Sequence, residues 1–235
     1  MTAYTDEEQA DRLKAFLKTY GSAMLSGILI ALIAFFGWQY WHNKQAANRF
    51  KLAHDYQQLT ETGQRLALTP DDKAAHTQFY AQTDALVKQD PNGGYAIQAL
   101  FLGAKLASAK QDYALAEKQL SQITSSKIKD DGLKQLAWLR LAAMQAAQAK
   151  YDPALNSLKN VTDDAFSASV NEAKGDILLL KKDTAGAKAA YQAAWDASVK
   201  REEPRELVKL KLESLGVSVP DVKIDGPIRQ PAAGV

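Results

Sequence analysis

Residues 139–162 read LRLAAMQAAQAKYDPALNSLKNVT, and this stretch decides the fold. It contains two alanine-rich runs, which the dipeptide Asp152-Pro153 separates. An aspartate followed by a proline is typical of a helix start, because the carboxylate caps free N–H groups and proline fits the first turn. A small residue stands at Ala142 in the first run and at Ala154 in the second, so the stretch predicts two helices that cross closely at these alanines.

The same pattern occurs on both sides of this stretch. Residues 101–124 align with it, and the corresponding pairs are Ala104 and Ala142, Leu106 and Met144, Tyr113 and Tyr151, Ala116 and Ala154, Leu120 and Leu158, Ile123 and Val161, and Thr124 and Thr162. A third copy places Gly175, Leu178, Ala187, Tyr191 and Ala194 at equivalent positions. The copies are about 38 and about 33 residues apart, close to the tetratricopeptide length of about 34. The sequence therefore predicts an all-α fold with a tetratricopeptide-like α-solenoid; the alternative is a generic alanine-rich helical bundle.

Further helices are predicted before and after the repeats. Residues 45–68 carry an apolar stripe of Phe50, Ala53, Tyr56 and Leu59. Thr69-Pro70 predicts the start of a helix that runs to about Gln89, with Phe79, Leu86 and Val87 directed inward. Pro204 opens a last helix, which would cap the stack with Leu207, Leu210 and Leu215 and end at Gly216.

A transmembrane helix is predicted at residues 21–41. The sequence has no fully charged residue from Thr19 to Asn43, and about 20 apolar residues suffice to cross a bilayer. Aromatic residues at both ends fit the interfacial belts. A cleaved signal peptide is the alternative, but the exit from the span is bulky rather than small, and the preceding tail is acidic. Residues 13–20 form either an interfacial lead-in turn or a simple extension of the span.

The predicted organisation has four parts: a short tail at residues 1–20, the span at 21–41, a tetratricopeptide-like domain at 42–216 and a flexible Pro/Gly-rich tail at 217–235. Each flank of the span carries three basic residues, so the positive-inside rule does not decide which side of the membrane holds the large domain.

Composition argues against catalytic and nucleic-acid-binding functions. The chain has no cysteine, a formal net charge of +2 and no basic stripe, so neither a thiolate zinc site nor nucleic-acid binding is indicated. Its three histidines do not stand at metal-ligand spacing, and no cofactor motif occurs. Paired aspartates at residues 71–72, 130–131 and 163–164 stand at predicted helix starts, where capping explains them better than catalysis does.

A protein-binding surface remains as the functional hypothesis. Stacked helix pairs form a concave face that is lined by the first helix of each pair. Repeat geometry places the following candidate binding residues on this face: Gln98, Phe101, Lys105, Leu139, Ala143, Glu172 and Asp176. Burial in the core is the alternative for Phe101 and Leu139. A mixed apolar and charged groove suits an extended peptide or a helix of another protein.

Several segments resemble the YfgM family, the ancillary subunits of the bacterial SecYEG translocon. They are the acidic tail, FLKTYG at residues 16–21, GWQYW at 37–41, and GDIL at 175–178 with Ala187. The resemblance extends to about Leu215. It implies an inner-membrane protein with a cytoplasmic N-terminus, a periplasmic repeat domain, and SecYEG and the membrane-anchored chaperone PpiD as partners.

The family role that this resemblance implies is non-enzymatic: handing newly translocated chains to periplasmic chaperones. Two other hypotheses stay open. One is an envelope scaffold that uses the repeats for assembly of another membrane complex. The other is an enzyme of unrecognised type, which would need a polar pocket with perturbed carboxylates.

Overall fold

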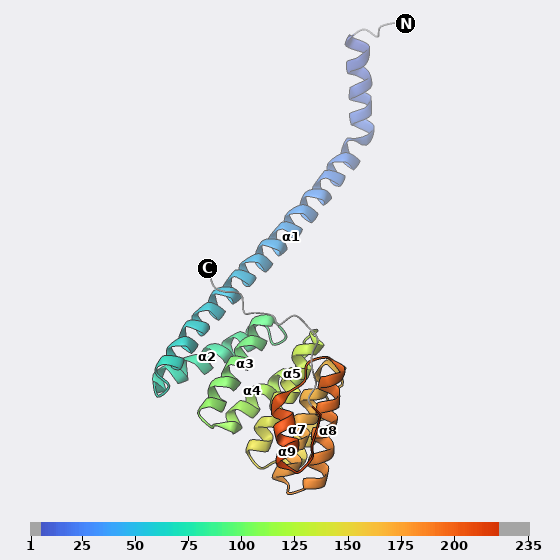
Figure 1. Ribbon diagram of the computed structural model, residues 1–235. Coiled ribbons are helices and arrows are strands. Elements are labelled where there is room, and N and C mark those ends of the chain that lie inside the picture. Colours follow the sequence, from blue (N-terminus) through green and yellow to red (C-terminus); the bar gives the residue numbers. More distant parts are fainter. Residues whose placement is uncertain (1–5, 221–235) are drawn as a thin grey trace, which may run out of the picture. The chain divides into compact units, whose positions relative to one another are not determined.

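The computed structural model describes residues 6–220, and in this range the chain forms helices and turns without a strand (Figure 1). The helices are α1 Asp6–Leu68, α2 Lys73–Gln89, α3 Gly94–Ala109, α4 Tyr113–Ser125, α5 Asp131–Ala147, α6 Tyr151–Leu158, α7 Ser167–Leu180, α8 Thr184–Lys200 and α9 Glu206–Ser214, with a short 3-10 helix η1 at Asp164–Phe166. The chain divides after His54, within α1, into two compact units. The all-α prediction is confirmed.

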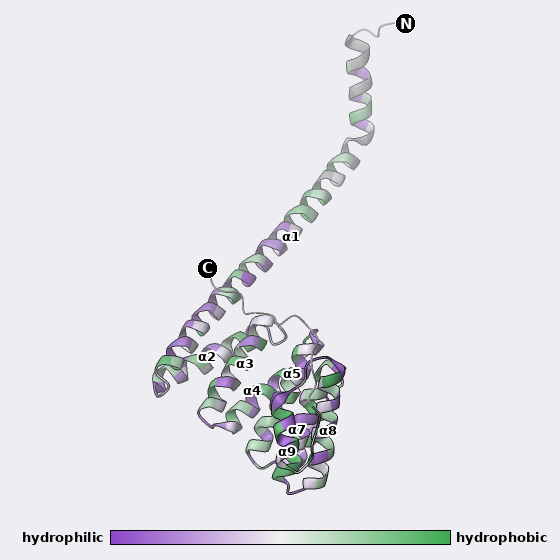
Figure 2. Ribbon diagram, viewed as in Figure 1, coloured by the Kyte–Doolittle hydropathy of each residue, from purple (hydrophilic) through white to green (hydrophobic). Residues whose placement is uncertain are grey.

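The first unit is the N-terminal part of α1. Its apolar side chains are exposed in the isolated chain: Leu25 is 69% exposed and Ile33 is 65% exposed. Figure 2 shows the hydropathy of this helix along the chain. Among the described residues, α1 is the one helix long and apolar enough to cross a membrane by length and composition. Residues 13–20 belong to the same helix α1.

The second unit consists of helices that pack in chain order, each on the next, and α5 also packs on α7. The pairs α3–α4, α5–α6 and α7–α8 form the three repeats, and α9 packs on α8. The predicted crossing positions are buried in all three pairs: Ala104 and Ala116, Ala142 and Ala154, and Gly175 and Ala187. The tetratricopeptide-like stacking that the alanines predicted is therefore present.

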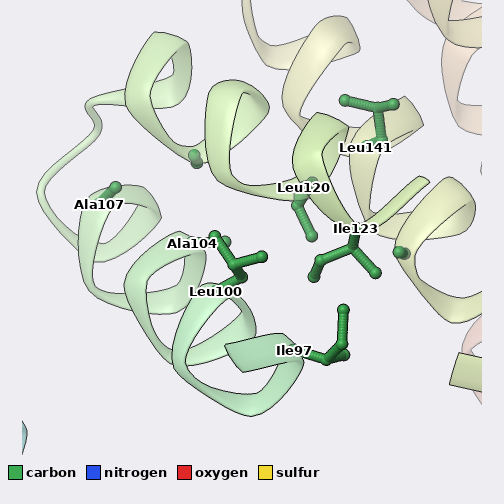
Figure 3. Packing of buried hydrophobic residues seen from close by; sticks show 9 residues of the cluster. Ile97, Leu100, Ala104, Ala107, Leu120, Ile123 and Leu141 are labelled. Carbon is green, nitrogen blue, oxygen red and sulfur yellow. The ribbon is translucent and has the colours of Figure 1, made fainter. Parts of the chain in front are cut away.

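The central core lies between α3, α4 and α5 (Figure 3). Leu100, Leu120 and Ile123 point toward one another there, and Ala104 leaves room for them. Burial of such side chains stabilises the fold by about 1.5–3 kcal/mol each. The same cluster includes Leu141 of α5, so it joins the first repeat to the second.

One turn geometry recurs at the end of each first helix. Gln111, Ala149 and Lys182 have φ values of 60°, 58° and 64°, in the left-handed region. In each turn the next residue donates its N–H to a carbonyl five residues back, as Lys150 does to Gln145 at 2.9 Å. This is the 6→1 bond of a Schellman motif. The turn thus recurs with the period of the repeats, although no glycine marks it in the sequence.

Aspartate side chains begin four of the helices. Asp72, Asp112, Asp130 and Asp183 each accept a backbone N–H three residues later, at 2.8–3.0 Å. The capping interpretation of the first two acidic pairs is confirmed, and Asp163 caps η1 in a similar way. The predicted helix start at Thr69-Pro70 is wrong, because α2 begins at Lys73 with Asp72 as its N-cap, and the hydroxyl of Thr69 donates to the carbonyl of Arg65 at the end of α1.

The predicted cap of α6 is also wrong. The helix begins two residues earlier than expected, so Lys150 stands at the N-cap without a side-chain cap bond. Asp152 lies inside the first turn, where it forms an ion pair with Lys181 of α7. A carboxylate in the first turn still favours the helix dipole, so the residue type fits although its role differs.

The predicted inward face of the last helix is wrong at Leu207 and Leu210, whereas the third predicted residue, Leu215, packs against the cluster of α8 and α9 as expected. Leu207 and Leu210 are 59% and 60% exposed, whereas Val208 and Leu212 are fully buried against α8. Two apolar stripes compete on this short helix, and the β-branched Val208 with Leu212 fits the cluster around Trp195. Gly216 ends the segment in a left-handed conformation, with φ +77°, as predicted.

Burial differs from expectation at the start and at the end of the repeat domain. Phe50 is 77% exposed, although Leu59 of the same stripe is fully buried. Val217 and Val219, which belong to the expected flexible tail, pack against the cluster of α8 and α9. The remainder of that tail, residues 221–235, lies outside the described residues.

Tyr80 of α2 explains why a glycine stands at position 103. Its hydroxyl donates to the carbonyl of Gly103 at 3.1 Å, and a Cβ at position 103 would meet the tyrosine ring at 3.3 Å. Burial, together with the charge of Asp112, raises the pKa of Tyr80 to about 12. The small residue therefore lets α2 pack closely on the first repeat.

Candidate functional site

The first helices of two neighbouring repeats border a groove of about 520 Å³, which we call the α3–α5 groove. Most of its lining comes from α3 and α5, with one residue each from α1 (Tyr56) and from α4 (Leu120). The lining residues are Tyr56, Gln98, Phe101, Leu102, Ala104, Lys105, Ser108, Leu120, Leu133, Leu136, Arg140, Ala143 and Met144. Repeat geometry predicts ligand contacts on the side that such first helices line.

The groove has an apolar base. Leu102, Leu133, Leu136 and Met144 are each half-buried, so their side chains expose apolar surface without being loose. Phe101 is also half-buried and packs against the central core. An apolar side chain of a partner would gain about 25 cal/mol for each Å² of such surface that it removes from water.

Two cations border this apolar base. The guanidinium carbon of Arg140 lies 5.0 Å from the centre of the Phe101 ring, a cation–π geometry that links α5 to α3. Lys105 and Arg140 are both exposed, and no acidic side chain lines the groove. Within residues 6–220 neither cation forms an ion pair. The groove therefore combines an apolar base with uncompensated positive charge.

The structure brings together four of the seven predicted binding residues. Gln98, Phe101, Lys105 and Ala143 line the α3–α5 groove. Leu139 lies elsewhere, half-buried in the cluster that joins α5, α6 and α7. Both alternatives for the apolar candidates thus occur, because Phe101 borders the groove while it contacts the core, and Leu139 contributes to packing.

Glu172 and Asp176, the remaining two, contact the C-terminal helix. Arg205 donates to Glu172 at 3.1 Å, and Lys211 donates to Glu172 at 2.9 Å and to Asp176 at 2.7 Å. The hydroxyl of Tyr191 donates to Asp176 at 2.6 Å. The negative charges of Glu172 and Asp176 are thereby compensated within the chain.

The same network shifts two pKa values. Burial raises the pKa of Tyr191, and the hydrogen bond to Asp176 and the charges of Asp176 and Glu172 raise it further. Burial lowers the pKa of Lys211, but its hydrogen bonds to Asp176 and Glu172 outweigh this effect, so the pKa is raised. These shifts mark a structural joint between α7, α8 and α9 rather than a catalytic pair.

Sequence reasoning missed most of the second wall of the groove. Its residues Leu133, Leu136, Arg140 and Ala143 stand at intervals of three, four and three. Gln98, Phe101, Lys105 and Ser108 on the first wall have the same intervals, which is the period of one helix face. A search for this shared spacing would have found Leu136 and Arg140.

A second, larger hollow of about 1090 Å³ lies beside the short helix α6. Trp138, Gln145, Asn156, Asn171 and Lys174 are among its lining residues. Its lining mixes apolar side chains, such as Leu155 and Val170, with polar ones, and it lies beside α6, which ends after eight residues. Within the described part of the chain, no group of three or more His, Asp or Glu side chains could hold a metal ion.

Comparison with known proteins agrees with this architecture. Residues 14–217 match the family described as tetratricopeptide repeat-like domain. The chain is 33% identical over 215 residues to the ancillary SecYEG translocon subunit of Aggregatibacter actinomycetemcomitans, covering 91% of this chain and all of that protein. Proteins of the same name from Haemophilus influenzae (89% of this chain, 97% of that protein) and Escherichia coli (92% and 100%) are 29% and 28% identical. The chain therefore belongs to the family of ancillary SecYEG translocon subunits, with a tetratricopeptide repeat-like domain.

Proposed function

We propose that this protein is a membrane-anchored adaptor of the Sec translocon, whose α3–α5 groove binds segments of other proteins. The observation that carries the proposal is the groove itself: an apolar base between two first helices, in a chain whose family members are named as translocon subunits. In this proposal the apolar run of α1 is the anchor in the bacterial inner membrane, and its length and composition support this role.

The anchor keeps the groove near the membrane through the continuous chain. Residues 42–54 connect the predicted span to Tyr56, the first groove residue, and they belong to the same helix α1. A domain that is attached in this way meets translocon partners at a high effective concentration, so even a weak groove can be useful.

The proposed topology places residues 1–20 in the cytoplasm and the repeat domain in the periplasm. In this arrangement, a chain that leaves the translocon reaches the groove before it folds. We further propose that a PpiD-like membrane-anchored chaperone then receives the chain. Half-buried apolar side chains such as Leu136 and Met144 suit a transient ligand, because their burial gives a modest gain for each side chain.

The proposal is tested by purifying the tagged full-length chain from detergent-solubilised inner membranes. Translocon subunits and a membrane-anchored chaperone should co-purify with the chain. The double variant Leu136→Ala, Phe101→Ala should still co-purify with the translocon subunits, which bind independently of the groove in this proposal. It should no longer co-purify with newly translocated proteins. Absence of translocon subunits above background would refute the adaptor role. The topology is tested separately, by comparing the protease accessibility of the repeat domain in spheroplasts with that in inverted vesicles.

A further inference from the structure

We propose that the α3–α5 groove selects segments in which apolar side chains are flanked by carboxylates. This inference deepens the proposed function of the same groove and rests on it. It starts from the charges of the lining: Lys105 and Arg140 are the charged side chains among the thirteen lining residues, and both are cationic.

The two cations stand on opposite walls. Lys105 belongs to α3 and Arg140 to α5, while the half-buried leucines of the base lie on the same two helices. Arg140 is held in place by its contact with the ring of Phe101, so its guanidinium is positioned before a ligand arrives. A cation that is already ordered loses less side-chain entropy on binding a carboxylate than a free one does.

The rest of the first-helix face does not cancel this charge. The acidic residues of α7, Glu172 and Asp176, are held by Arg205 and Lys211 of the C-terminal segment. Glu117 of α4 is likewise paired with Lys150, at 2.8 Å. The lining of the groove therefore offers a partner two cations and no acidic side chain, and this charge indicates an acidic, partly apolar protein segment.

The inference distinguishes this groove from a purely apolar surface for unfolded chains. A purely apolar groove would bind a segment of either charge equally well. The α3–α5 groove, in contrast, repels lysine-rich segments because like charges in one interface are unfavourable. Selectivity for charge is thus the measurable consequence.

The experiment uses the full-length chain in nanodiscs of zwitterionic phosphatidylcholine, so that the lipid adds no net charge. Three fluorescent 14-residue peptides serve as probes: one with Leu and Phe anchors between glutamates, one with every glutamate replaced by lysine, and one with the glutamates kept and every anchor replaced by serine. Fluorescence anisotropy gives the affinity of each peptide at low and at high salt. The first peptide should bind most tightly, and salt should weaken its binding.

Charge reversal in the protein provides the second arm. Lys105→Glu and Arg140→Glu should each lower the affinity for the glutamate peptide by about three- to tenfold and raise the affinity for the lysine peptide. Lys118→Glu is the matched control: it reverses an exposed lysine of α4 outside the groove and should leave all affinities unchanged. Arg140→Lys should retain the preference for glutamate.

The outcomes separate this inference from the proposed function. Equal binding of the glutamate and lysine peptides, with no binding of the serine peptide, would overturn charge selection and leave an apolar groove. Binding of none of the peptides would overturn both. The chain could also form a dimer in the nanodiscs. If Lys105→Glu dissociates that dimer, a second copy of the chain occupies the groove, and the assignment to a segment of another protein is overturned.

Discussion

The ring of Tyr191 occupies the space that a side chain at Gly175 would need. A Cβ at position 175 would lie 2.5 Å from Cδ1 and from Cε1 of that ring. The ring cannot move away easily, because it is buried in the cluster of α8 and α9 and its hydroxyl is bound to Asp176. The close crossing of α7 and α8 therefore depends on the missing side chain.

Gly175→Ala should lower the free energy of unfolding by about 1–3 kcal/mol, because the added methyl group overpacks this crossing. Thermal denaturation measures the effect. The control is Gly94→Ala, since a Cβ there meets no heavy atom within 4 Å. The control should keep or slightly raise the melting temperature. Equal melting temperatures for the two variants would contradict the claim that the close crossing of α7 and α8 requires a glycine at position 175.

Ala149→Gly should stabilise the protein, by about 0.5–1 kcal/mol. Ala149 has a φ of 58°, a conformation that costs an L-residue about 1–2 kcal/mol and that glycine adopts freely. The gain is reduced by the greater entropy of glycine in the unfolded chain. Ala189→Gly, at an exposed position inside α8, should instead destabilise by about 0.5–1 kcal/mol. Urea denaturation distinguishes the two signs, and a loss at both positions would argue against the left-handed turn.

Stability should decrease in alkaline solution through the Lys211–Tyr191 joint. Both pKa values are raised in the folded state, so the folded protein holds these protons more tightly than the unfolded chain does. Their contribution is complete below about pH 10 and is lost as the pH rises toward the folded pKa values. Lys211→Met should be less stable than the wild type at pH about 8, and the difference should shrink by pH about 11.

The control for this prediction is Lys118→Met, which removes an exposed lysine of α4. This variant should follow the pH dependence of the wild type. If the curve of unfolding free energy against pH for Lys211→Met also runs parallel to that of the wild type, the joint does not couple protonation to folding.

Glu117→Gln should reduce the loss of stability in acid. Burial raises the pKa of Glu117, but hydrogen bonds from Lys150, Gln148 and Gln145 outweigh it, so the folded pKa is lowered. The stabilising contribution is therefore complete above the unfolded value of about 4.3 and is lost as the pH falls through the folded value. Glu117→Gln should lower the free energy of unfolding by on the order of 1 kcal/mol at neutral pH, and this free energy should then fall less steeply as the pH is lowered into the acid range. Glu213→Gln, at an exposed position of α9, serves as the control, and an acid limb as steep as that of the wild type would refute the role of Glu117.

The sequence predicted the repeats well because small residues at helix crossings have few alternatives. Ala142, Ala154 and Gly175 are buried where the period placed them. It predicted the last helix less well, because a nine-residue helix offers two apolar stripes and only the neighbour selects Val208 over Leu207. The turn at Ala149 was invisible for a related reason: a non-glycine residue in the left-handed region gives no compositional signal.

The groove was predicted in part for an equally physical reason. Repeat geometry indicates which helices line a shared face, and Gln98, Phe101 and Lys105 do lie on one wall of the groove, while their role in binding stays a prediction. It does not indicate which charges the C-terminal helix will neutralise. Arg205 and Lys211 are far from Glu172 in sequence, so their ion pairs emerge only when α9 packs on the last repeat.

Site-specific photocrosslinking from position 101 of the full-length chain tests the central claim most directly. Benzoylphenylalanine replaces Phe101 in inner-membrane vesicles that are actively translocating a radiolabelled secretory protein, with the same probe at Lys118 as the control. Our account predicts adducts with the translocating chain from position 101 and not from position 118. Adducts that are absent from position 101, or equally abundant from both positions, would contradict it, provided that the chain carrying the probe remains membrane-bound and folded.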